Sequence, residues 1–160
     1  MDHYNLIIAA RALHVVGGVF WAGFVLTIVL LMAIAAGRSP QDRRSLRSLV
    51  TSLAPRVMPL AGGITLLSGI YLFAVLHDSD RSFGAYVLGF GALAAIAASV
   101  AGSAGAGRAA RQLALIDAAP EQPGAAAEAA RLEHRLTAAA RLSAVLIVIS
   151  AAAMGVARYL

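Results

Sequence analysis

The sequence predicts an all-α integral membrane protein, a bundle of four transmembrane helices. The chain of 160 residues is 60% hydrophobic and has a mean hydropathy of +0.79, which is too apolar for an ordinary soluble domain. Its apolar segments are long enough to cross a bilayer, and two arginine-rich segments interrupt them. No segment reads as a linker to a soluble domain, so residues 1–160 are expected to form a single transmembrane domain.

The first predicted transmembrane helix covers about residues 6–36. Its uninterrupted apolar part, residues 15–36, would be about 33 Å long at 1.5 Å per residue, enough to cross the hydrocarbon core. Because this run is longer than the apolar region of a secretory signal peptide, we expect it to stay in the protein. Gly37 and Pro40 are expected to end the helix.

A dense positive cluster follows the first helix, with Asp42 as its one acidic residue. By the positive-inside rule this loop is expected to be cytoplasmic. Apolar residues at helical spacing between residues 46 and 53 predict a short interfacial helix before Pro55. The basic residues of the cluster are Arg38, Arg43, Arg44, Arg47 and Arg56.

The second and third transmembrane helices are predicted at about residues 57–76 and 83–106. The polar turn between them, residues 77–81, is then expected to lie outside the cell. Both helices are rich in small residues, which let helices pack closely in lipid. In the second they are Gly62, Gly63, Thr65, Ser68 and Gly69. In the third they recur every four residues and predict a packing face rather than a pore lining: Gly91, Ala95, Ser99 and Ser103.

A second arginine-rich segment, again expected to be cytoplasmic, precedes the fourth transmembrane helix at about residues 142–158. An alanine-rich helix begins near Ala125 and is expected to run into the fourth transmembrane helix without a break. Both termini would then lie outside, and helices one and two and helices three and four would form antiparallel pairs. The basic residues of this segment are Arg108, Arg111, Arg131, Arg135 and Arg141.

One narrow face of the first helix carries its unusual residues. Gly17, Gly18 and Trp21 follow His14 by three, four and seven residues, so all four share one side of an α-helix. Histidine inside a membrane needs a partner, water or a metal, and adjacent glycines leave a slot for a helix or a planar ligand. His14 is therefore a candidate cofactor ligand. The alternative is a histidine held by a neighbouring hydroxyl or carbonyl group, with glycines that serve only helix packing.

Further side chains suited to a haem b site are predicted at the outer end of the bundle. Histidine and methionine are common axial haem ligands, so His77 and Met154 are candidates for a second ligand to the iron. Arg11, one turn before His14, could pair with the haem propionates. Alternatively, His77 lies too near water, Met154 only fills the core, and the iron has five ligands.

A second constellation of donors suits copper or zinc. It combines nitrogen and carboxylate ligands from His3, His77, Asp78 and Asp80 near the outer face. His134 lies between a glutamate and an arginine in the predicted cytoplasmic helix, and we interpret it as a solvated surface residue.

The composition excludes several functional classes. The chain has no cysteine, and all 13 of its basic side chains are arginine, so thiolate and lysine chemistry are absent. No hydrolase, nucleotide-binding or zinc-protease motif occurs, and the predicted transmembrane helices hold no acidic residue for a proton relay. The net charge of +5 sits beside apolar helices, so we expect a lipid bilayer rather than nucleic acid as the partner.

A histidine followed after six residues by Trp-x-Gly, here His14, Trp21 and Gly23, resembles small bacterial proteins with four transmembrane helices around the copper resistance protein D family and the protoporphyrinogen oxidase of HemJ type. The stretches TLLSGIY (residues 65–71) and MGVARYL (residues 154–160) are also similar to this group. The resemblance implies either a haem b site with His14 as ligand or copper handling in the bacterial envelope. The oxidase type also carries a functional lysine that this chain lacks, so the substrate stays open.

The leading hypothesis is a multi-pass protein of the bacterial inner (plasma) membrane that binds haem b and acts in electron transfer or haem-linked redox, as a carrier or as a membrane oxidoreductase with no catalytic residue assigned. The second hypothesis is a component for transport of copper or another metal. The third is an accessory subunit without a cofactor, whose small-residue stripes bind a partner helix. A homodimer or a redox partner protein is compatible with the first hypothesis.

Overall fold

A computed structural model describes residues 3–77, 81–119 and 121–160. In these residues the chain is helical apart from short connections, and four of its helical segments are long and apolar enough to cross a membrane. This confirms the predicted all-helical class and describes a multi-pass membrane protein. The elements are α1 (His3–Ala36), α2 (Pro40–Leu76), α3 (Phe83–Val100), the π-helical segment η1 (Ala101–Gly107), α4 (Arg108–Ala118) and α5 (Ala125–Ala157).

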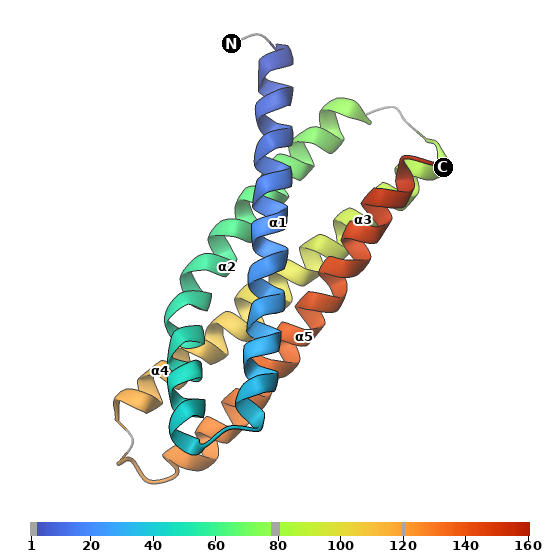
Figure 1. Ribbon diagram of the computed structural model, residues 1–160. Coiled ribbons are helices and arrows are strands. Elements are labelled where there is room, and N and C mark those ends of the chain that lie inside the picture. Colours follow the sequence, from blue (N-terminus) through green and yellow to red (C-terminus); the bar gives the residue numbers. More distant parts are fainter. Residues whose placement is uncertain (1–2, 78–80, 120) are drawn as a thin grey trace.

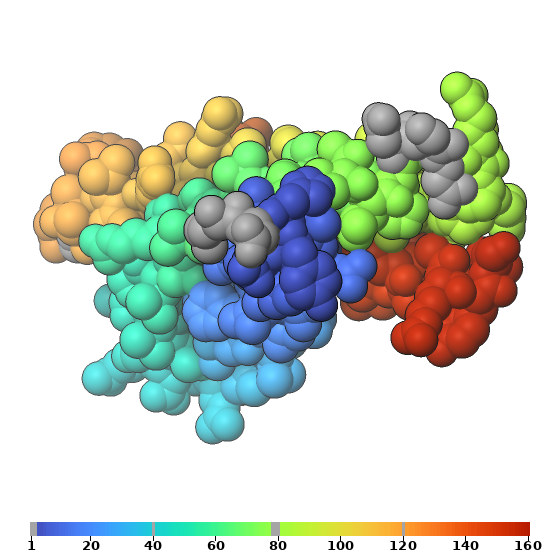
Figure 2. Space-filling view, turned by 90° about the horizontal axis from the view of Figure 1, so that it is seen from above, coloured from blue at the N-terminus to red at the C-terminus, as the bar shows by residue number. Residues whose placement is uncertain are grey.

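The bundle consists of two antiparallel pairs of helices (Figure 1). α1 packs chiefly against α2, while α3 and η1 pack chiefly against α5. The turns from α1 to α2 and from α4 to α5 lie at one end, which we call the arginine-rich end (bottom of Figure 1). The two chain termini lie at the opposite end, which we call the terminal end. There the first turns of α1 stand apart from the last turns of α5 (Figure 2).

α2 is one continuous helix and begins earlier than the predicted second transmembrane helix. Ser39 caps it, because its side chain accepts a hydrogen bond from the backbone N–H of Asp42 at 3.2 Å. The segment predicted as a separate interfacial helix is thus the first part of α2. Neither Pro55 nor Pro59 breaks the helix. Pro59 has no N–H for the carbonyl of Pro55, and the Arg111 side chain donates to that oxygen instead, at 3.3 Å.

The other helices also extend beyond a bilayer core. α1 has 34 residues and α5 has 33, so each is about 50 Å long, against about 30 Å of hydrocarbon. The alanine-rich helix predicted near Ala125 is the first part of α5, which runs on without a break to Ala157. The arginine-rich segments are therefore largely helical continuations of the bundle rather than loose loops.

The closely packed core lies between Trp21 and the arginine-rich end. All four long helical segments contribute to it, and Trp21, which is only 3% exposed, is its outermost large side chain on α1. The largest fully buried side chains there are Val25, Ile28, Met58, Leu113, Leu132 and Leu136.

Glycines of α3 and η1 permit close contacts with α2 and α5. A Cβ atom at Gly102 would lie 2.9 Å from Cε of Met58, and one at Gly105 would lie 2.8 Å from Cβ of Ala139. The predicted stripe on the third helix is thus a packing face within the chain. Its residue Gly91 is buried, and a Cβ there would lie 3.0 Å from that of Ala153.

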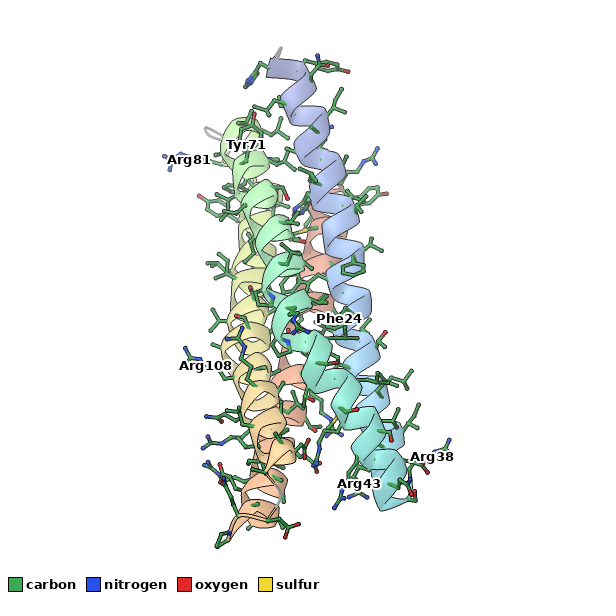
Figure 3. The ribbon with its side chains drawn as sticks, turned by 90° about the vertical axis from the view of Figure 1, so that its left-hand side faces the viewer. Phe24, Arg38, Arg43, Tyr71, Arg81 and Arg108 are labelled. Carbon is green, nitrogen blue, oxygen red and sulfur yellow. The ribbon has the colours of Figure 1, made fainter. Side chains whose placement is uncertain are left out.

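An ion-pair network joins three helices at the arginine-rich end. The guanidinium of Arg47 on α2 pairs with Asp117 on α4 and with Glu133 on α5. Its side chain is 11% exposed, so this network is shielded from water better than an ordinary surface pair. At the same end, Arg38 extends outward (Figure 3), whereas the guanidinium of Arg43 donates hydrogen bonds to the carbonyl oxygens of Ala35 and Ala36 at the end of α1.

Candidate functional site

A cavity of about 500 Å³ lies in the half of the bundle toward the terminal end, between the two helix pairs. All four long helical segments line it, and the lining is almost entirely apolar. Its volume falls within the range of about 300 to 1,000 Å³ that is usual for cofactor and ligand sites. Residues that line it include His14, Gly18, Trp21, Thr65, Gly69, Phe73, His77, Leu88, Ala95, Ser150 and Met154.

Besides His14, four of the residues singled out from the sequence as candidates for cofactor binding or metal ligation line this cavity. They are Gly18, Trp21, His77 and Met154. The spacing argument placed the first two beside His14 on one helix face, and the structure adds α2 and α5 as the facing walls. Trp21 forms the floor, since it is both part of the cavity and part of the buried core.

A backbone carbonyl on α2 orients the ring of His14. Nδ1 of His14 lies 2.9 Å from the carbonyl oxygen of Thr65. A carbonyl oxygen only accepts hydrogen bonds, so Nδ1 carries the proton and donates. In the neutral ring Nε2 then keeps its lone pair. A histidine held in this way by a backbone carbonyl is the usual form of a metal-ligating histidine.

The hydrogen bond to the Thr65 carbonyl also agrees with the alternative interpretation of His14, in which it is a membrane histidine held by a neighbouring backbone group. That hydrogen bond occupies only Nδ1, whereas a purely structural role needs no large cavity beside the ring. Both readings agree on the position of His14, and they differ in what Nε2 binds.

Two small residues of α2 and α1 permit the close approach of these helices. A Cβ atom at Gly69 would lie 2.7 Å from Cε1 of His14 and 3.0 Å from its Nδ1. A Cβ atom at Gly17 would lie 3.0 Å from Oγ1 of Thr65. Gly17 thus serves helix packing and does not line the cavity, whereas the imidazole of His14 packs directly against Gly69.

Thr65 and Gly69 were not predicted as site residues. Both were recognised in the sequence as small residues that favour close packing and as members of the stretch at residues 65–71. Their role depends on which residue of α2 faces His14, and that registry is a tertiary property. Neither signal identifies which residue of this stretch contacts His14.

Met154 and His77 occupy different parts of the far wall. Met154 reaches the cavity from α5. His77, which is the C-terminal cap of α2 at the terminal end, also lines it. The ring of His77 stacks on Phe73 with 5.6 Å between ring centroids. Its Nδ1 is buried and has no hydrogen-bond partner within the described residues. A buried nitrogen without a partner is unfavourable, so a ligand or water in the cavity would stabilise it.

The structure does not bring Arg11 to the cavity. Its side chain is exposed, and it is not among the lining residues. His134 is exposed on α5, in keeping with its interpretation as a surface residue.

The metal constellation is described only in part. His3 is the first residue of α1, whereas Asp78 and Asp80 lie outside the described residues. Among the residues that the structure describes, no group of three or more His, Asp or Glu side chains is arranged to hold a metal ion.

Comparison with protein-family models, with curated proteins and with solved structures yields no significant match to this chain in any of the three.

Proposed function

We propose that this chain is a membrane protein that binds haem b, with His14 as an axial ligand, and that it acts in electron transfer or haem-linked redox. The observation that carries the proposal is the pairing of His14 with the large apolar cavity. Its Nδ1 is held by the carbonyl of Thr65, at 2.9 Å, while the ring borders the cavity. Nε2 of the neutral ring thereby keeps its electron pair for binding a metal, and the ring borders a space large enough for a cofactor.

The donor set fits a haem better than it fits a free metal ion. One imidazole nitrogen, a thioether at Met154 and otherwise apolar walls can hold a macrocycle that carries its own four nitrogen ligands. A bare copper or zinc ion needs three or more protein ligands in one place, and no such group occurs in the described part of the chain. A bound haem b would supply one-electron redox chemistry.

The residues of this chain then have distinct tasks. His14 would hold the iron, and Thr65 fixes the ring plane and the proton on Nδ1. Gly69 leaves room for the imidazole itself, and Gly18 lines the cavity beside it. Trp21 separates the cavity from the core, because it is buried between them. The apolar walls exclude water, which favours retention of an apolar macrocycle.

The two other hypotheses receive less support. The accessory-subunit reading assigns the small residues of the second and third helices to a partner helix, but Gly62 faces Trp21 and Ser99 within the chain, and Gly91 faces Ala153. The copper-transport reading depends on Asp78, which lies outside the described residues, and on His77.

We further propose that the chain belongs to the bacterial group that it resembles in His14, Trp21 and Gly23, that it resides in the inner membrane with both termini outside, and that it docks a second copy or a redox partner. The arginine-rich turns lie at one end of the bundle and the termini at the other, which supports this orientation (Figure 1). Alkaline phosphatase fused to the C-terminus should be active, and green fluorescent protein at the same place should stay dark. The reverse pattern would invert the orientation.

The test of the haem site is the visible spectrum of the purified protein, oxidised and reduced with dithionite. We expect a Soret band and sharp α and β bands on reduction for the wild type, and their loss in His14→Ala. His134→Ala removes an exposed histidine from the same chain and should leave the spectrum unchanged. A colourless wild type from haem-replete cells would contradict the proposal, and so would equal haem content in both variants.

A further inference from the structure

A second, smaller cavity of about 210 Å³ lies between α2 and the continuous helical segment formed by η1 and α4. It is distinct from the His14 cavity and is lined by other residues. Its walls include the two prolines of α2, two residues of η1 and two arginines of α4: Pro55, Pro59, Ser103, Gly107, Arg108 and Arg111.

Within the described residues, no carboxylate pairs with the arginines of this cavity. Arg111 donates one hydrogen bond, to the carbonyl of Pro55 at 3.3 Å, and so retains further N–H donors. No hydrogen bond or ion pair is recorded for Arg108 among the described residues, and its side chain extends outward from the bundle (Figure 3). The nearest acidic residue along α4, Asp117, is engaged by Arg47. Two guanidinium groups are therefore available to an anion.

The cavity lies at the depth where the hydrocarbon core ends. The apolar part of α2 begins at Val57, directly after Arg56, and the apolar part of the third long segment ends just before Arg108. Arginines at such a boundary lie at the level of the lipid headgroups. An amphiphile could thus keep its acyl chains in the hydrocarbon region while its phosphate reaches the cavity.

We infer that this cavity binds the phosphate of an anionic phospholipid. The guanidinium groups of Arg108 and Arg111 bind the phosphate oxygens. Ser103 donates its hydroxyl proton to the carbonyl of Ser99 at 2.6 Å, and its oxygen is left to accept a hydrogen bond from a headgroup hydroxyl such as that of phosphatidylglycerol. The absence of an N–H at Pro59 contributes to this site, because it leaves the Pro55 carbonyl to anchor Arg111.

The test compares lipids added to the delipidated protein in detergent. Phosphatidylglycerol should raise the melting temperature of the wild type and remain bound in native mass spectra, whereas phosphatidylcholine, which has no net charge, should do neither. The Arg108→Gln/Arg111→Gln variant should bind phosphatidylglycerol roughly tenfold more weakly or worse, since each arginine near the headgroups contributes to anionic-lipid affinity. The charge-matched control, Arg38→Gln/Arg44→Gln, changes two exposed arginines, one between α1 and α2 and one near the start of α2, and should bind like the wild type.

Three results would overturn the inference: equal binding of both lipids, retention of phosphatidylglycerol by the Arg108→Gln/Arg111→Gln variant, or equal loss in the control. Inorganic phosphate or glycerol phosphate serves as the soluble arm. If either one gives the same stabilisation as the lipid, the cavity is a site for a soluble phosphate and the lipid assignment is wrong. Should the double variant fail to fold, Arg108→Gln alone changes an outward side chain and must still weaken lipid binding.

Discussion

The imidazole of His14 lies against the backbone of Gly69, so closely that a methyl group at residue 69 would come within 2.7 Å of Cε1. This contact joins the first and second transmembrane helices at the point where the cavity begins. Hydrogen is therefore the only side chain at residue 69 that leaves the ring where the Thr65 carbonyl can hold it.

Gly69→Ala is the sharpest test of this contact. The added methyl group must push the imidazole away from Thr65, so we expect lower haem occupancy or an altered Soret band, measured by absorption after purification. Gly63→Ala is the matched control, because a Cβ there meets nothing within 4 Å. Alanine is favoured over glycine in a helix by about 0.5 to 1 kcal/mol, so Gly63→Ala should be neutral or slightly stabilising. Equal effects of the two substitutions would exclude a specific role of Gly69.

The registry of the helices distinguishes the two candidates for a second ligand. Gly62 lies against Ser99 and Gly91 against Ala153, so Gly69, seven residues after Gly62, is level with the part of α5 next to Ala153. Met154 is therefore near the level of His14. His77 follows Gly69 by eight residues, or about 12 Å along the helix axis.

From this registry we expect Met154→Leu to change the spectrum of the reduced protein and to lower its reduction potential, because a thioether ligand raises the potential of haem iron. His77→Ala should leave both properties near those of the wild type. A redox titration monitored at the α band measures the two variants side by side. An unchanged potential in Met154→Leu would exclude the thioether as a ligand, and a large change in His77→Ala would point to His77 instead.

Much of this site could be predicted because it lies on one helix. Helical spacing alone places Gly18 and Trp21 beside His14, and the four long apolar segments follow from length and composition. Arg11 shows the limit of that argument. It is about 60° from His14 around the helix, and that angle is enough to turn its side chain from the cavity to the exposed surface.

Features that depend on two helices were not predictable. The continuity of α2 through its prolines depends in part on Arg111, which is 56 residues away from Pro55 in the sequence. The glycines of the π-helical segment η1 likewise lie against α2 and α5. Sequence periodicity describes one helix at a time, and it contains no information on such long-range partners.

The stability of the first turns of α5 should depend on pH. A hydrogen bond from Arg131 lowers the pKa of Glu128 below its ordinary value of 4.5. The charged carboxylate therefore stabilises the helix at pH values above 4.5, and this stabilisation is lost as the pH falls through the lowered pKa of the folded state. Hydrogen exchange should show faster opening of these turns in acid, and Arg131→Gln should remove that dependence on pH. An unchanged acid response in Arg131→Gln would assign it to other groups.

Arg47 should matter more than the other arginines of the arginine-rich end. It bridges Asp117 and Glu133, and its side chain is 11% exposed. Arg47→Ala leaves two carboxylates close together without a counter-charge, so we expect a loss of about 1 to 3 kcal/mol in the free energy of unfolding, between the values for surface and buried pairs. Arg44→Ala removes the same charge from an exposed site of the same helix and should have little effect. Unfolding monitored by circular dichroism in detergent measures both variants.

Because Arg47 joins α2 to α4 and α5, its loss should also separate the helix pairs at this end. A disulfide engineered between the pairs there should then restore stability. Equal stability of the two alanine variants would show that the bridge contributes nothing beyond its net charge.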